Sequence, residues 1–211
     1  MILIVGAMSE EIEQIAQQVQ DGQLAGKAVH VEAVGVGKVM SAMNTQRLID
    51  QLQPDFVLMV GVAGALNPAL SIGDIVLAER TIQHDLDTTA LGIPRGTVPF
   101  TSWRWLEADP EWLQKARDLL QCHCGIILTG DQFMSRSAQQ QNAYLRAELH
   151  GDAVDMESAA VAQVCACNSI PHLVIRMISD TADGSAKVDF WRFMPQAGKR
   201  LAEIVVDLIQ A

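Results

Sequence analysis

Three acidic residues in this sequence stand where a strongly apolar stretch begins or ends. Glu11 comes shortly after ILIVGA, Glu157 lies in VDMES before an apolar run, and Asp180 ends HLVIRMISD. Carboxyl groups that share a cleft can act as general acid and general base on a glycosidic bond. The residue types therefore predict acid–base chemistry, provided that the fold brings the three side chains together.

Each acid also has a purely structural explanation. Glu11, together with Glu10, would complement the dipole at the start of a helix, as acids in a first helical turn often do. Glu157 would cap the helix that follows it, and Asp180 would cap the turn in ISDTADG. For any one acid alone the structural explanation is the better one. Three acids at three strand ends nevertheless favour a shared site.

The elements that must position these acids alternate along the chain. Near-continuous apolar runs are typical of strands buried on both faces. Such runs begin at Ile2, Val29, Phe56, Gly73, Cys124 and His172. Helical patterns are expected over residues 9–20, 38–53, 110–121, 136–149, 157–168 and 190–210. The alternation predicts an α/β fold in which helices flank a mainly parallel sheet.

In open α/β sheets, ligands bind beyond the carboxyl ends of the strands. In that arrangement Glu11, Glu157 and Asp180 would converge on one cleft. The glycine-rich turns GVGK and GVAGAL would let the backbone approach a ligand closely, but neither is a complete phosphate-binding motif. Phe133 stands at a strand end too, where its ring could stack on a flat base or simply pack in the core.

The composition narrows the class of protein. A chain of 211 residues with 49% hydrophobic and 19% charged residues suits one compact domain spanning residues 1–211. The formal net charge of −10 argues against nucleic acid or an anionic membrane as a partner, because phosphate contacts need clustered Lys and Arg. No stretch is long enough to cross a membrane, and the amino terminus does not resemble a signal peptide. We therefore expect a cytoplasmic protein.

Three further features have simpler interpretations. The cysteines, at positions 122, 124, 165 and 167, lack the spacing of a metal site, so we expect free thiols in a reducing cytosol. His84 is the best polar candidate among the histidines, although a position on a surface loop is the simpler expectation. The irregular segment 83–109 contains two Trp and two Pro, and we expect it to be functional or covered by a partner.

Seven segments carry a family resemblance. In chain order they are IVGAMSEEI, VGVGKV, GVAGAL, GDIV, TGDQFM, VDMESAAVA and RMISDTAD. They resemble the 5′-methylthioadenosine/S-adenosylhomocysteine nucleosidases of the purine nucleoside phosphorylase superfamily, from residue 2 to about residue 206. The resemblance implies a single α/β domain with a central mixed, barrel-like sheet, no metal or cofactor, and a homodimer. The implied reaction is irreversible hydrolysis of the N-glycosidic bond of an adenine thionucleoside.

The resemblance also assigns roles to residues. Glu11 resembles the base that activates water, Glu157 the acid that holds the ribose hydroxyls, and Asp180 the acid that protonates adenine at N7. The implied substrate-binding residues are Phe133 on the base, the Met134 backbone at its edge, Met156 on the ribose, Ser179 beside Asp180, Arg176 near the water, and Met8 and Phe190 around the 5′-thio group.

Two departures from the family bear on the substrate. Val62 stands where the family often has a hydroxyl residue, and Leu91 where a bulky aromatic residue of the partner subunit is usual. These residues keep futalosine or aminofutalosine open as substrates.

A carboxylate at Glu11 would repel phosphate but can deprotonate water, which favours hydrolysis over phosphorolysis. The alternative from another class is a catalytically silent nucleoside-binding protein of the same fold.

Overall fold

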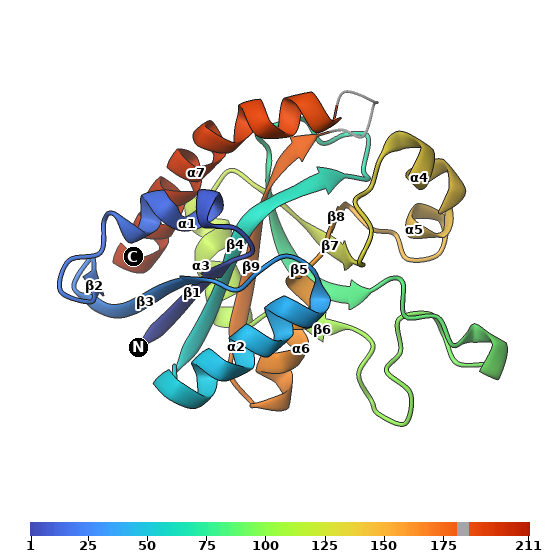
Figure 1. Cartoon of the computed structure of the whole chain (residues 1–211), viewed down its shortest axis with the longest axis horizontal. Helices are drawn as coiled ribbons and strands as arrows, with labels where there is room; N and C mark the ends of the chain where they lie inside the picture. Colours follow the sequence, from blue (N-terminus) through green and yellow to red (C-terminus); the bar gives the residue numbers. More distant parts are fainter. Residues whose placement is uncertain (181–185) are drawn as a thin grey trace.

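The computed structural model describes the backbone of residues 1–180 and 186–211, and the side chains of residues 1–135, 138–180 and 193–211. Across these residues one mixed nine-stranded sheet is flanked by helices, as Figure 1 shows. The predicted α/β fold class is confirmed.

The bounds of the elements follow the predicted alternation. The strands are β1 (Ile2–Gly6), β2 (Gln23–Leu24), β3 (Lys27–Ala33), β4 (Phe56–Ala65), β5 (Ile75–Gln83), β6 (Leu106–Glu107), β7 (His123–Thr129), β8 (Ala153–Asp155) and β9 (His172–Asp180). The helices are α1 (Ser9–Ala16), α2 (Lys38–Leu52), the 3₁₀ helix η1 (Thr89–Leu91), α3 (Pro110–Leu119), α4 (Arg136–Gln141), α5 (Tyr144–Ala147), α6 (Ser158–Cys167) and α7 (Ala186–Gln210).

The sheet closes on itself into a barrel. β4 pairs with β9 and β8, β5 pairs with β9 and β7, and β7 pairs with β8, which completes the ring. The pairs β4–β9, β5–β7 and β7–β8 are parallel, whereas β5–β9 and β4–β8 are antiparallel. β1 and β3 extend the sheet from β4 as parallel neighbours. The mixed, barrel-like sheet implied by the family resemblance is confirmed.

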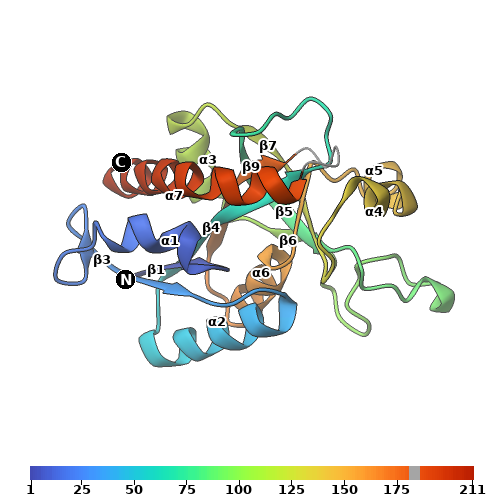
Figure 2. The same cartoon turned by 45° about the horizontal axis from the view of Figure 1, so that its top comes forward.

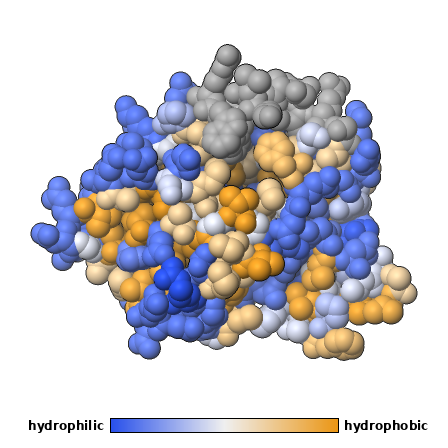
Figure 3. Space-filling model, in the orientation of Figure 1, coloured by the Kyte–Doolittle hydropathy of each residue, from blue (hydrophilic) through white to orange (hydrophobic). Residues whose placement is uncertain are grey.

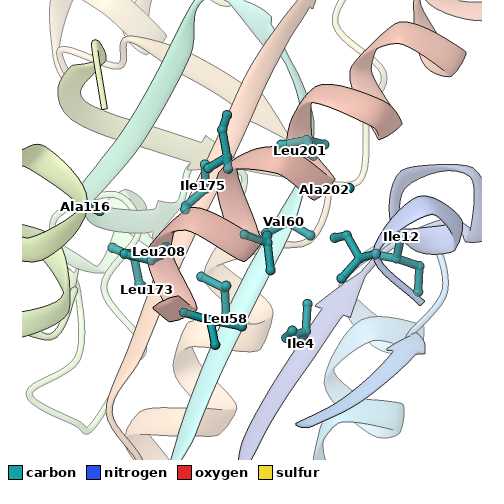
Figure 4. Close-up of a cluster of buried hydrophobic side chains, with 14 of the residues drawn as sticks. Ile4, Ile12, Leu58, Val60, Ala116, Leu173, Ile175, Leu201, Ala202 and Leu208 are labelled. Carbon is teal, nitrogen blue, oxygen red and sulfur yellow. The ribbon is translucent and has the colours of Figure 1, made fainter. Parts of the chain in front are cut away.

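Both faces of β1 and β4 are buried, which explains their continuous apolar sequences. On one face, α1, α3 and α7 cover the sheet, and Figure 4 shows Ile12 of α1 and Leu201 of α7 beside Ile4 and Val60. On the other face, α2 and α6 cover it, as the turned view in Figure 2 makes clear. The two helical layers hold the carboxyl ends of the central strands in place.

The helix predicted over residues 136–149 is wrong in extent, because the chain forms the two short helices α4 and α5 instead. The Asn142 side chain donates to the Ala138 carbonyl at 2.8 Å, and such local bonds compete with continued helix. The last helix starts at Ala186 rather than at residue 190. None of the helices in the described ranges is both long and apolar enough to span a bilayer.

Candidate active site

A cavity of about 390 Å³ opens at the carboxyl ends of β1, β4 and β9, beside β8 and the turn after β7. Glu11, Glu157 and Asp180 all line this cavity, so the structure brings together the three acids of the sequence analysis. The other predicted residues that line it are Met8, Val62, Phe133, Met134, Met156 and Ser179.

Two of the predicted residues whose side chains are described do not line the cavity. Arg176 lies behind the acids and is fully buried. Leu91 belongs to η1, is 72% exposed, and is not among the residues around the cavity of this chain. The side chain of Phe190 lies outside the described residues.

Glu11 occupies the first turn of α1 and is only 2% exposed. Its carboxylate accepts the Met8 N–H at 2.9 Å, as the helix-start explanation requires, and also the Val62 N–H of β4 at 2.9 Å. The bond from Val62 holds Glu11 near the carboxyl end of β4. Glu11 therefore both stabilises the start of α1 and lines the shared cavity. Burial raises the pKa of Glu11 above its usual range, although Arg176 and the two N–H groups oppose this shift.

Arg176 of β9 lies at the centre of three carboxylates. Its Nε donates to Asp155 Oδ2 at 2.8 Å, its Nη1 lies 3.7 Å from Glu11 Oε1, and its Nη2 lies 3.6 Å from Glu157 Oε2. The residue of β4 beside Arg176, Gly61, must be a glycine. A Cβ at this position would lie 2.0 Å from Arg176 Nη1 and 2.4 Å from Glu11 Oε1. Three acids around one guanidinium leave an excess of negative charge next to the cavity.

Asp155 lines the cavity as well, and its contacts were not predicted from the sequence. Besides Arg176, its carboxylate accepts the Thr129 hydroxyl at 2.6 Å and the backbone N–H of Ser158 at 3.2 Å. Asp155 thus caps the start of α6, which leaves Glu157 free for another partner. The spacing of Asp155 and Glu157 on either side of Met156 is the sequence feature from which the different roles of the two acids could have been predicted.

Glu157 does not cap its own helix, so that structural explanation is wrong. Its Oε1 instead accepts the Gly37 N–H at 2.9 Å, from the turn before α2. Burial raises the pKa of Glu157 to about 7; Arg176 lowers it, and Asp155 raises it further. When ionised, the Glu157 carboxylate at the cavity wall can accept hydrogen bonds from hydroxyl groups or stabilise a positive charge.

This pKa predicts how stability depends on pH. Because the pKa in the fold lies above the ordinary value of 4.5, folding with an ionised Glu157 carries a cost that grows as the pH rises from 4.5 through about 7. Glu157→Gln should therefore match the wild type near pH 4.5 and exceed its stability at pH 8, by up to about 3 kcal/mol. Thermal melting across this pH range measures the difference. Glu203→Gln, at an exposed position of α7, is the control, and equal wild-type and Glu157→Gln curves at pH 8 would contradict the assignment.

Asp180 ends β9 and is 3% exposed. The Ser179 hydroxyl lies 3.0 Å from Asp180 Oδ2 and 3.3 Å from the carbonyl oxygen of Ala63, so it can donate to either. A Cβ on Gly64 would approach Asp180 Oδ1 to 3.3 Å, so the end of β4 packs tightly against this acid. The turn that Asp180 would cap lies outside the described residues.

The remaining wall is largely apolar. Phe133 is 51% exposed at the cavity, whereas Met134 is buried in the cluster beneath α4 and α5. Val36 and Gln132 also line the cavity and were not predicted, although both stand inside the motifs GVGK and GDQFM. A flat, partly apolar ligand could lie between these side chains and the acids.

His84 is 2% exposed, so the expected surface position is wrong. His84 directly follows the last residue of β5, Gln83, and lies against Gly130 in the turn after β7. The Nδ1 of His84 lies 3.0 Å from the Tyr144 hydroxyl oxygen. Burial lowers its pKa. All four cysteines are free thiols, of which Cys165 is buried and Cys167 exposed. No group of three potential ligands among the described His, Cys, Asp and Glu residues is arranged to hold a metal ion.

Comparison with known proteins decides the family. The model of the phosphorylase superfamily matches residues 1–210. A 5′-methylthioadenosine/S-adenosylhomocysteine nucleosidase of Geobacillus thermodenitrificans is 35% identical in an alignment that covers 98% of this chain and 94% of the relative. The chain belongs to this nucleosidase family.

Solved structures agree with this nucleosidase family. The nucleosidase of S. pneumoniae with the transition-state inhibitor MT-ImmA has a TM-score of 0.93 and 31% identity, over 100% of this chain and 98% of that one. A futalosine hydrolase of Helicobacter pylori has a TM-score of 0.89 and 30% identity, over 99% and 97%. The overall fold is therefore shared by enzymes that are named for different substrates.

Proposed function

We propose that this chain hydrolyses the N-glycosidic bond of 5′-methylthioadenosine, S-adenosylhomocysteine or both, releasing adenine and the 5-thioribose product. The observation that carries the proposal is the meeting of Glu11, Glu157 and Asp180 around one cavity. The names of the similar nucleosidases support the choice of substrate. In this proposal residues 1–211 act as one nucleosidase-like domain.

The three acids would divide the work. Glu11 takes a proton from the attacking water, and its raised pKa makes it a better base than an exposed glutamate. Glu157 holds the ribose hydroxyls and stabilises the positive charge that develops on the sugar, which a buried carboxylate does better than a solvated one. Asp180, oriented by Ser179, donates a proton to the leaving base.

The apolar residues suit the rest of the nucleoside. Phe133 can stack on the base, and the Met134 backbone can reach its edge. Met156 would line the ribose. Met8, Val36 and Val62 provide an apolar wall that fits a thioether better than a free hydroxyl group.

Water, rather than phosphate, is the proposed nucleophile. The described residues that line the cavity include four acids but no Lys, Arg or His. The nearby Arg176 already contacts three carboxylates. A phosphate dianion would therefore find no free cation to pair with among these residues, whereas neutral water needs none.

A substrate panel tests the proposal. Purified protein is incubated with methylthioadenosine, S-adenosylhomocysteine and aminofutalosine, each with and without phosphate, and the free base is quantified. We expect adenine release from one or both thionucleosides at a rate that does not depend on phosphate. Tight binding without release of any base would instead support the catalytically silent alternative, and a rate that requires phosphate would indicate a phosphorylase.

Futalosine or aminofutalosine hydrolysis is the second candidate. It is motivated by Val62 in the cavity wall and by Leu91, where the family usually has a bulky aromatic residue of the partner subunit. The similarity to a futalosine hydrolase supports it as well. Faster release from aminofutalosine than from either thionucleoside would favour this candidate.

We further propose that the enzyme is a homodimer. Three apolar side chains of α2, Val39, Met40 and Met43, are exposed. Figure 3, in the orientation of Figure 1, shows apolar residues gathered in the middle of the face that it views. The loop that carries Leu91 projects from the body in Figure 1 and also contains the fully exposed Phe100. These surfaces would be covered by a second copy.

The dimer predicts a specific response to charge. Met43→Glu should shift the protein towards monomer in sedimentation velocity, because a buried unpaired carboxylate is costly. Leu119→Glu, at a comparably exposed apolar position of α3, is the control and should leave the sedimentation coefficient unchanged. A wild-type protein that is fully active as a monomer at assay concentration would contradict the proposal.

We also propose that the enzyme acts in the cytoplasm, where free thiols such as Cys165 stay reduced.

A further inference from the structure

Three charged residues form a cluster beside the cavity, separate from the acids described above. The Lys38 ammonium donates to Asp85 Oδ1 at 2.6 Å and lies 4.0 Å from Asp131 Oδ2. The Lys38 backbone N–H donates to Asp131 Oδ1 at 2.8 Å, and the Asp131 N–H donates to Asp85 Oδ2 at 3.0 Å. Each of the three residues therefore contacts both of the others.

The cluster joins three segments that are far apart in the sequence. Lys38 is the first residue of α2, Asp85 follows β5, and Asp131 follows β7. The contact with α2 is close, since a Cβ on Gly37 would lie 3.2 Å from Asp131 Oδ1. Without this cluster, the turn before α2 and the turn after β7 would lose the charged contact between them.

Both ends of the cluster adjoin residues that line the cavity. Gly37, directly before Lys38, donates its N–H to Glu157 Oε1 at 2.9 Å and so holds the proposed ribose-binding acid. Asp131 is followed at once by Gln132, Phe133 and Met134, which form the proposed base-binding side. The cluster thus links the two sides of the cavity through the turns that carry them.

Lys38 supplies the positive charge between two carboxylates. Burial raises the pKa of Asp85, but the hydrogen bonds from Lys38 and the Asp131 N–H outweigh this, and the net shift is downward. If the ammonium were removed, Asp85 and Asp131 would face each other as like charges. Repulsion would then push the turn after β7 away from the segment after β5, and that turn would lose its ion pair with α2.

We propose that Lys38 is a positioning residue, which through Asp85 and Asp131 holds the ribose side and the base side of the cavity at the separation that a nucleoside requires. The inference rests on the proposed function for its consequence in catalysis. Lys38 does not line the cavity, so it acts through the residues on either side of the cluster and not by its own contact with the reacting atoms.

Kinetics of matched variants test this role. Lys38→Met should raise KM for methylthioadenosine about 10-fold and lower kcat only about threefold, because most of the base and ribose contacts that it disturbs hold the substrate before reaction, and only the Glu157 contact also stabilises the developing cation. Arg117→Met removes a cation whose ion pair with Glu79 is of similar length, 2.7 Å, but lies away from the cavity, and it should leave both constants unchanged. Lys38→Arg should stay within about threefold of the wild-type KM.

A double variant separates charge from packing. Asp85→Asn added to Lys38→Met removes the repulsion between the two acids, so the double variant should regain about threefold of the lost KM. A Lys38→Met enzyme with wild-type KM would overturn the inference. A double variant no better than Lys38→Met would overturn the electrostatic basis.

A second measurement does not depend on catalysis. In the free protein, Lys38→Met should speed amide hydrogen exchange at Gly37 and Asp131 by about 10-fold or more, while amides of β1 and β4 keep wild-type protection. Unchanged exchange at both amides would overturn the inference. A wild-type enzyme that releases no base from any nucleoside would refute the proposed function instead, and exchange would still decide the role of Lys38.

Discussion

Asp180→Asn is expected to lower turnover by about 100- to 10,000-fold, the usual contribution of a general acid, with little change in the fold. The carboxyl group is buried beside Ser179, and an amide of the same shape fits the same space. The amide keeps a hydrogen bond to the Ser179 hydroxyl but cannot supply a proton to the leaving adenine. The loss should therefore fall on kcat more than on affinity for the nucleoside.

Single-turnover release of adenine, combined with thermal melting, measures this effect. Asp207→Asn, at an exposed position of α7, controls for the chemical change and should keep wild-type turnover. Ser179→Ala should lose less than Asp180→Asn, about 10-fold, because it only frees the acid to rotate. If Asp180→Asn retains more than about a tenth of wild-type turnover, another group donates the proton.

Glu11→Gln is expected to abolish hydrolysis while sparing most of the affinity for the nucleoside. The carboxylate is proposed to activate water, which is an interaction of the transition state, and not to hold the base or the ribose. Glutamine keeps only one acceptor oxygen for the N–H groups of Met8 and Val62, so the variant should also be less stable by about 1–3 kcal/mol. The comparison of affinities must therefore be made below its melting temperature.

Glu157→Gln should behave differently, although both acids adjoin Arg176. Its carboxylate is proposed to hold the ribose hydroxyls in the ground state as well as to stabilise the cation, so turnover and affinity should fall together. Calorimetric binding of a non-hydrolysable adenosine analogue to both variants, set beside their turnover, tests the distinction. Should Glu11→Gln lose as much affinity as Glu157→Gln, Glu11 would be a binding or structural acid instead.

The sequence by itself determined the fold class and the place of the acids. Continuous apolar runs such as ILIVGA and FVLMVGVAGAL predict strands with two buried faces, and β1 and β4 are buried in this way. Glu11 follows β1 and Asp180 is the last residue of β9, and both strands run parallel to β4. The carboxyl ends of such strands meet at one edge, so a shared cavity could be foreseen without any side-chain contact.

Only the tertiary structure decided the partners of those acids. The burial of His84, the capping of α6 by Asp155 and the position of Arg176 behind the cavity depend on strands that meet across the barrel. Apolar periodicity reports which faces are buried, but it is the same for parallel and antiparallel neighbours, and β8 is too short to produce it. Gly37 and Glu157, which are 120 residues apart, share a hydrogen bond of 2.9 Å. Such a bond forms only when the whole sheet has closed, and no local pattern encodes it.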